Sequence, residues 1–315
     1  MSGIAPGGKD RELDAGTVRE LLRAQFPQLA PFEVRYLAEG WDNEMYEVNG
    51  RWLMRLPKRA NAATYQPLER RLLEGLRAQL PLSIPHFELQ GRASALFPYD
   101  FVGYRKLDGV FANEVPLKRF ATDENAAKLG GLLSTLHAVP VEQARAWGVG
   151  GSDSASQAEE LADRMTTVRE QREAIDRAFG PERAARYAGF VERAEVSVEE
   201  TAQRVLIHDD LDTGHILLDD STHEVSAVID WADASIGDPA SDFVCLWVRC
   251  GETFLQSLID HYTLPVDAGL PERVRFRGRW ALLDWVGDTL QQDPENVQQW
   301  LDCFEHVFPE GFEGR

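Results

Sequence analysis

LIHDDLDTGHILLDDSTHEVSAVIDWADASIGDPASDF, residues 206–243, is the stretch that decides the fold of this 315-residue chain. It sets His208, Asp210 and His215 in the pattern H-x-D-x-x-x-x-H, and an apolar run then leads to Asp230. Apolar segments at 205–207, 216–218 and 225–229 are typical of short strands. We therefore expect a polar loop whose side chains are presented at strand ends, over a cleft.

The spacing of Asp210, His215 and Asp230 suits the transfer of a phosphoryl group. That chemistry needs a carboxylate to orient the attacking hydroxyl and accept its proton, and ligands for the magnesium that bridges the nucleotide phosphates. Asp210 is the candidate catalytic base, and His215 and Asp230 are the candidate metal ligands. Asp209 and Asp212 compete with Asp210, but only Asp210 has the five-residue spacing to His215.

Each of these residues also has a structural interpretation. The segment D-D-L-D-T-G, residues 209–214, is rich in turn formers, and aspartates in turns often accept hydrogen bonds from backbone amides. His215 could equally close the loop by hydrogen bonding. We expect His208 to hold the loop through backbone groups. Asp238 and Asp242 are expected to cap a helix or brace a loop.

The charge of the chain narrows the choice of partner. It has 33 basic and 52 acidic residues, a net charge of −19, which argues against nucleic acid or an anionic membrane surface. A cationic substrate fits this charge, although the acid excess also serves solubility. The three cysteines have no metal-binding spacing, the N-terminus has no apolar core, and no long apolar run is present. These features predict a cytoplasmic protein. We expect it to be a monomer.

The chain is expected to have two parts, as in the α+β, bilobal fold of eukaryotic protein kinases. Residues 1–107 predict a small antiparallel sheet, with a disordered tail at 1–12, a helix at 17–25, a hairpin at Asn49-Gly50 and a helix at 67–80 that has Pro67 in its first turn. A hinge is expected at about 104–109. Residues 108–315 predict a large helical lobe, with helices over 120–138, 155–178, 181–202, 241–247, 254–261, 274–290 and 296–303.

A cation of the first lobe must meet the nucleotide phosphates. Arg55 lies on a predicted strand, and Glu69 of the following helix is its natural ion partner. Lys58 is a rival for the phosphate role, and a solvated surface position is the alternative for these charges. No G-x-G-x-x-G loop is present in the sequence, so residues 38–43 at the first hairpin are the candidate phosphate cover.

These motifs resemble the aminoglycoside phosphotransferase superfamily, most of all the aminoglycoside 2″-phosphotransferases, with macrolide phosphotransferases close. The resemblance covers roughly residues 30–245 and includes I-D-W at 229–231, D-P at 238–239 and D-F at 242–243. It implies a kinase-like fold, two Mg²⁺ ions and transfer of the γ-phosphate of GTP or ATP, with Asp210 as the base and His215 and Asp230 as metal ligands. Arg55 stands where the family often has lysine.

The resemblance also implies a nucleotide hinge and an acceptor. Tyr104 matches the position that gates the pocket behind the base, and backbone groups around Arg105, Lys106 and Leu107 would pair with the purine. A bulky Tyr104 is similar to members that favour GTP.

The expected acceptor is a hydroxyl of an aminoglycoside. The alternatives are a macrolide in a cleft lined by tryptophans, a sugar or amino alcohol, and a pseudokinase scaffold. The candidate ammonium-binding acids are Glu252, Asp260, Asp284 and Asp288, and the candidate cleft tryptophans are Trp247, Trp280, Trp285 and Trp300.

Overall fold

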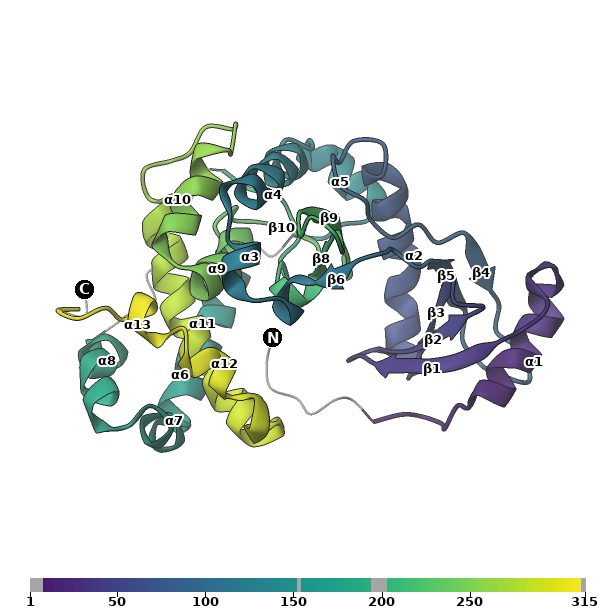
Figure 1. The fold of residues 1–315 in the computed structure, drawn as a ribbon, viewed down its shortest axis with the longest axis horizontal. Coiled ribbons are helices and arrows are strands. Elements are labelled where there is room, and N and C mark those ends of the chain that lie inside the picture. The colour runs from purple at the N-terminus through teal and green to yellow at the C-terminus, as the bar shows by residue number, and fades with distance from the viewer. Residues whose placement is uncertain (1–7, 152–153, 194–202, 313–315) are drawn as a thin grey trace.

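A computed structural model of the chain describes residues 8–151, 154–193 and 203–312. Its N-terminal part is a five-stranded antiparallel sheet in the order β1-β2-β3-β5-β4, with helices α1 and α2 beside it (Figure 1). The bounds are α1 Ala15–Gln25, β1 Val34–Glu39, β2 Asn43–Val48, β3 Trp52–Pro57, α2 Ala60–Leu76, β4 Leu89–Gly91 and β5 Phe101–Arg105. The predicted small-sheet lobe is thereby confirmed.

A tight hairpin joins β2 to β3, as Asn49-Gly50 predicts. Both residues have positive φ, 55° and 63°, which the primed hairpin turns require and which asparagine and glycine tolerate. The turn pairs Val48 with Trp52 and thereby sets the register that pairs Met45 with Arg55. Arg55 is thus placed on the central strand of the sheet, with its side chain buried.

Helix α2 begins seven residues earlier than predicted. Pro67 lies inside the helix and not in its first turn, so the prediction of a start at 67 is wrong. The segment 60–66 contains three alanines and continues the helix upstream, although proline removes one backbone donor. Glu69 therefore sits in the middle of the helix, where its buried side chain faces the sheet.

The predicted disorder of residues 1–12 is wrong for 8–12, while 1–7 lie outside the described residues. Lys9 forms ion pairs with Glu39 and Glu44, at 2.7 Å and 2.5 Å, and the Asp10 amide donates to the Lys58 carbonyl at 3.0 Å. Glu44 is buried, so it requires a counter-charge, and Lys9 supplies it. This charge pairing holds the segment on the sheet.

The second lobe is mainly helical and surrounds two small sheets (Figure 1). The strands are β6 Val110–Phe111, β7 Val205–Ile207, β8 Ile216–Leu218, β9 Val225–Val228 and β10 Ser235–Gly237. The helices are α3 Leu117–Phe120, α4 Asp123–His137, α5 Val141–Trp147, α6 Ser154–Glu170, α7 Arg172–Phe179, α8 Pro181–Arg193, α9 Ser241–Cys250, α10 Glu252–Asp260, α11 Leu270–Gln292, α12 Gln298–Leu301 and α13 Phe304–Val307. Short 3-10 turns lie at Pro27–Leu29, Ala112–Glu114, Thr213–His215 and Pro294–Asn296.

Most of the predicted elements of this lobe are confirmed, with two corrections. The helix predicted over 155–178 is broken at Gln171 into α6 and α7, and the one predicted over 120–138 is preceded by the separate turn α3. The end of the helix predicted over 181–202 lies outside the described residues beyond 193. The three cysteines are free thiols. In the described part of the chain, no helix combines the length and apolar character that crossing a membrane requires.

Candidate active site

The loop between β7 and β8 is braced by one buried carboxylate. Asp242, in the first turn of α9, accepts the backbone amides of His208 and Asp209 at 2.9 Å and 2.8 Å. His137 of α4 bonds the same carboxylate at 3.0 Å. Asp209 has a φ of 66°, a left-handed conformation that costs free energy in a non-glycine residue. The two amide bonds to Asp242 hold the loop in this shape, as the prediction of a loop brace requires.

His208 links this loop to the strand that leads to Asp230. Its Nε2 lies 3.1 Å from the carbonyl oxygen of Ile229, and its Nδ1 lies 3.3 Å from the amide of Asp210. A carbonyl only accepts and an amide only donates, so the ring is neutral, with its proton on Nε2. Burial lowers the pKa of His208, which agrees with a neutral ring. The predicted backbone-holding role is therefore confirmed.

Asp210, His215 and Asp230 meet at one point. His215 Nδ1 lies 2.8 Å from the backbone oxygen of Asp210 and 3.5 Å from its carboxylate, while Nε2 lies 3.6 Å from the carboxylate of Asp230. One ligand atom from each of the three residues falls within 4.8 Å of the others. Because Nδ1 donates to the carbonyl, the lone pair of a neutral ring is on Nε2, facing Asp230.

The local electrostatics differ among the acidic side chains. Burial raises the pKa of Asp210 to about 6, although the neighbouring His215 opposes the shift. Asp230 follows β9 with a φ of 62°, another left-handed residue, and its side chain is 42% exposed. Asp230 is therefore more accessible to a ligand than Asp210, whose side chain is 20% exposed.

The turn interpretation holds for Asp212 and not for Asp210. The Asp212 carboxylate accepts the Gly214 amide and the Thr213 hydroxyl, each at 2.9 Å, and caps the turn Thr213–His215. Asp209 accepts the Ser235 hydroxyl at 2.9 Å. Both rivals of Asp210 thus have bonds that brace the loop.

Arg55 and Glu69 form a buried ion pair across β3 and α2, at 2.7 Å between Nη1 and Oε1. Burial alone would lower the pKa of the Arg55 guanidinium, but the charges of Glu69 and Asp230 outweigh it and raise that pKa. Lys58, the rival cation, is instead bonded to Glu39 at 2.6 Å and to the Gly40 carbonyl at 3.2 Å. Arg55 therefore lies close enough to Asp230 for the Asp230 charge to act on its guanidinium group.

The hinge region follows β5. Tyr104 is buried beside Phe87, with ring centroids 5.8 Å apart. Arg105 and Lys106 are exposed, and the Lys106 amide donates to the Arg51 carbonyl at 2.8 Å. Because the Lys106 amide already donates to Arg51, the Leu107 amide is better placed than the Lys106 amide to bind a ligand.

Comparison with known proteins places this geometry in a family. The model of the phosphotransferase enzyme family, APH, matches residues 33–292, most of the chain. The chain belongs to this phosphotransferase family. It is 24% identical, over 225 residues, to the uncharacterized protein YcbJ of Bacillus subtilis strain 168, a match that covers 67% of either chain.

Solved structures of other phosphotransferases share the fold. The GDP and kanamycin complex of APH(2″)-IIIa has a TM-score of 0.70 at 25% identity, over 92% of this chain and 97% of that one. Macrolide 2′-phosphotransferase type I has a TM-score of 0.64 at 22% identity, over 95% and 98%. The predicted superfamily and its kinase-like fold are therefore confirmed.

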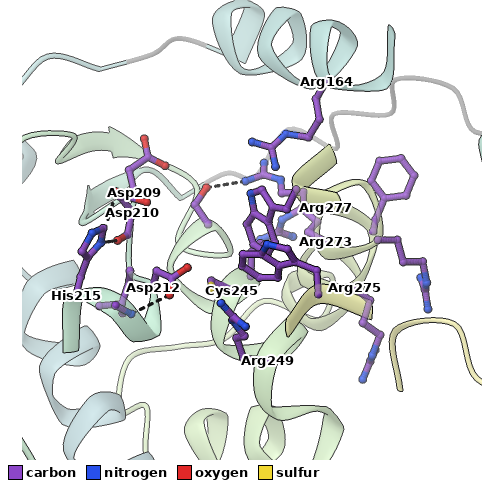
Figure 2. A pocket seen from close by; sticks show the side chains of 18 of the residues that line it. Arg164, Asp209, Asp210, Asp212, His215, Cys245, Arg249, Arg273, Arg275 and Arg277 are labelled. Atoms are coloured by element: carbon purple, nitrogen blue, oxygen red, sulfur yellow. Dashed lines mark hydrogen bonds and ion pairs between the residues drawn. The ribbon is translucent and has the colours of Figure 1, made fainter. Parts of the chain in front are cut away.

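A cavity of about 910 Å³ opens beside the loop between β7 and β8 of this phosphotransferase. Figure 2 shows Asp209, Asp210 and His215 on one side of it, and Arg164, Arg273 and Arg277 across from them. Trp285 and Trp300 also line the cavity, whereas Trp247 and Trp280 are buried in the core. The arginines of the lining are Arg164, Arg249, Arg273, Arg275, Arg277 and Arg279.

The four acids predicted to bind ammonium groups are absent from the described lining of this cavity. Glu252 is bonded to Arg275, and Asp284 lies 3.5 Å from Arg164. The sequence-based predictions did not include these arginines, although the run R-V-R-F-R-G-R at 273–279 is unusual in an acidic chain. Their position on a cavity wall could not be read from that run, because charged residues on a helix are usually solvated.

Proposed function

We propose that this phosphotransferase transfers the γ-phosphate of GTP or ATP to a hydroxyl of a small molecule, with Asp210 as the catalytic base. The observation that carries the proposal is the position of Asp210, which lines the acceptor-sized cavity and lies 3.5 Å from His215. An acceptor hydroxyl in that cavity would be within reach of the carboxylate. A raised pKa suits a base that must take up a proton near neutral pH.

His215 and Asp230 would hold Mg²⁺. In the neutral ring with its proton on Nδ1, the Nε2 lone pair of His215 faces the Asp230 carboxylate, so this donor set fits a divalent cation. Magnesium prefers oxygen ligands and usually keeps several waters, which makes a nitrogen ligand less usual. When bound, the metal would neutralise charge on the nucleotide phosphates.

The nucleotide would lie between Arg55 and the hinge. Arg55, oriented by Glu69, would meet the phosphates near Asp230, and the base would contact the backbone at Arg105, Lys106 and Leu107, of which the Leu107 amide is unoccupied by the sheet. Tyr104 fills the space behind the hinge, and on that ground we propose use of GTP at least as well as ATP. Clearly better turnover with ATP across concentrations would count against this preference.

Two classes of acceptor are candidates, aminoglycosides and macrolides. An aminoglycoside is supported by the kanamycin complex of a similar structure, and it would make this protein an antibiotic resistance enzyme. The arginines of the cavity wall do not favour a polycation there. A macrolide is the second candidate, because Trp285 and Trp300 supply aromatic surface with ring centroids 4.7 Å apart.

The test is nucleoside diphosphate release by purified protein with Mg²⁺, with GTP and ATP in turn. The acceptors would be aminoglycosides, macrolides, simple sugars and their amino and acidic derivatives. Asp210→Ala is expected to lower the rate by about 10²–10⁴ while nucleotide binding is kept. Asp220→Ala, an exposed acid of the nearby turn, is the control. Near-normal turnover by Asp210→Ala together with loss of turnover in Asp212→Ala would move the base to Asp212.

A further inference from the structure

The cavity beside Asp210 has two walls of opposite charge. The loop wall carries Asp209, Asp210 and Asp212 (Figure 2). The remaining wall, from α6, α9 and α11, carries the guanidinium groups and one carboxylate, that of Glu272. A molecule that fills the cavity would touch both walls. Its reacting hydroxyl would have to lie on the acidic side, at Asp210, so the rest of the molecule would face the arginines.

Most arginines of the opposite wall have carboxylate partners. Arg273 bonds Asp238 at 2.8 Å and Asp267 at 2.7 Å, and Arg277 reaches the same Asp238 at 2.9 Å. Asp238 is thus shared between two guanidinium groups. Together with Asp267, it balances the charges of Arg273 and Arg277.

Arg249 differs from these arginines, because among the described residues it has no carboxylate within ion-pair distance. Burial would raise the pKa of the nearby Asp212 carboxylate, but the charge of Arg249 helps to lower it. The Arg249 guanidinium lies flat against Trp300, 3.7 Å from the ring centroid, and donates to the side chain and backbone oxygens of Gln299 at 2.9 Å and 3.5 Å. Its Nε has no hydrogen-bond partner in the described part of the chain. The stack and the two bonds orient the charge in advance, while part of its donor capacity stays unused.

We propose that the acceptor carries an anionic group, a carboxylate or a phosphate, which Arg249 binds while the hydroxyl lies at Asp210. This inference rests on the proposed function and names its substrate class. A fork of guanidinium donors matches the oxygens of such an anion, and a guanidinium group without an ion-pair partner in a partly enclosed cavity gains from binding one. Trp285 and Trp300 would cover the apolar part of the molecule.

The acceptor arm of the test uses matched compounds that differ in charge: glucose, gluconate, glucose 6-phosphate and glucosamine, with kanamycin and erythromycin. The acidic members are expected to exceed the neutral and amino members in kcat/KM. For the best acidic member, Arg249→Gln should raise KM about 10- to 100-fold with a smaller change in kcat. Arg249→Lys, which keeps the charge, should recover part of that loss. Arg183→Gln, an arginine stacked on Phe304 outside the cavity, is the matched control.

A second readout needs no acceptor. The fluorescence of Trp285 is the difference between the emission of wild type and that of Trp285→Phe. Its quenching would be measured with iodide and with caesium ions. The Arg249 guanidinium, which lies over Trp300 next to Trp285, would concentrate iodide there, whereas the net charge of −19 favours caesium over the rest of the surface. Iodide is expected to quench this component at least twofold better, and Arg249→Gln should reduce the preference.

The two readouts separate the inference from the proposed function. Equal or better quenching by caesium, or efficient phosphorylation of kanamycin with a KM that Arg249→Gln leaves unchanged, would overturn the anionic acceptor. Iodide-selective quenching with diphosphate release that survives Asp210→Ala would overturn the catalytic assignment and leave the anionic site standing.

Discussion

His208 joins the two halves of the active site to each other: its Nε2 donates to the carbonyl oxygen of Ile229, 3.1 Å away. His208 precedes the candidate base Asp210 by two residues, and Ile229 precedes the candidate metal ligand Asp230 by one. This single bond therefore ties the catalytic loop to the strand end across the site. The loop keeps its left-handed residue, Asp209, because this bond and the carboxylate of Asp242 hold both of its sides.

Stability should depend on pH through His208. Burial lowers its folded-state pKa below the ordinary value of 6.5. Above pH 6.5 the ring is neutral in both states and its contribution to stability is complete. Below pH 6.5 the unfolded chain binds a proton that the folded chain does not, so stability falls by up to about 1.4 kcal/mol per pH unit until the folded pKa is reached.

The measurement is urea unfolding of wild type and His208→Gln at pH 7.5 and 5.5. The variant should lose part of the stability difference between the two pH values, because glutamine does not titrate. It should also be less stable than wild type at pH 7.5, by about 1–3 kcal/mol. His86→Gln, a histidine away from the loop, should keep the full pH dependence. Equal pH dependence in wild type and His208→Gln would contradict a neutral buried ring.

Activity should fall on the acid side as Asp210 gains a proton. The pKa of Asp210 is raised to about 6 by burial, so its carboxylate is charged, and able to act as a base, above that pH. We expect kcat/KM to decrease about tenfold per pH unit below an acid limb at or under pH 6. A bound cation favours the carboxylate, so limiting Mg²⁺ should move the limb upward toward pH 6. A limb at pH 7 or above would point to His215 as the titrating group.

Removal of the Asp230 carboxylate should uncouple nucleotide binding from magnesium. In the wild type, EDTA should weaken the binding of a fluorescent GTP or ATP analogue, because the metal links the phosphates to His215 and Asp230. Asp230→Ala should bind the nucleotide with the same weakened affinity in the presence of Mg²⁺ or EDTA. Asp220→Asn serves as the control. A wild-type response to Mg²⁺ in Asp230→Ala would place the metal elsewhere.

Loss of the Arg55–Glu69 ion pair should lower the free energy of unfolding far more than loss of an exposed ion pair on α2. Both side chains are buried, so Arg55→Gln or Glu69→Gln leaves an unpaired buried charge and should cost about 3–5 kcal/mol. The double variant should lose much less than the sum. Arg70→Gln and Glu74→Gln remove an exposed pair of α2, 3.0 Å apart, and should change stability by less than about 1 kcal/mol.

Thermal or urea unfolding measures these differences, and a nucleotide-binding assay separates the two members of the buried pair. Arg55→Gln should weaken nucleotide binding more than Glu69→Gln, because only Arg55 would contact the phosphates. Additive effects in the double variant would show that the two side chains act independently, against the 2.7 Å contact.

Local sequence was sufficient to predict the features that depend on residues close to one another along the chain. The Asn49-Gly50 turn, the apolar runs of β7, β8 and β9 and the spacing from Asp210 to His215 are set by backbone preferences and by a loop of a few residues. The start of α2 was misplaced because Pro67 is tolerated inside that helix, where its surroundings outweigh its usual preference for the first turn.

Tertiary structure alone decided which charges meet. The Asp242 carboxylate reaches His208 across 34 residues, and Arg273 reaches Asp238 across 35. No local pattern reveals such pairs, because the energy of an ion pair depends on distance and burial and not on sequence separation. Net charge suggested a cationic substrate, whereas the fold places guanidinium groups on the wall opposite Asp210. The sequence therefore determined the spacing of the candidate site residues, and packing determined which charges line the cavity beside them.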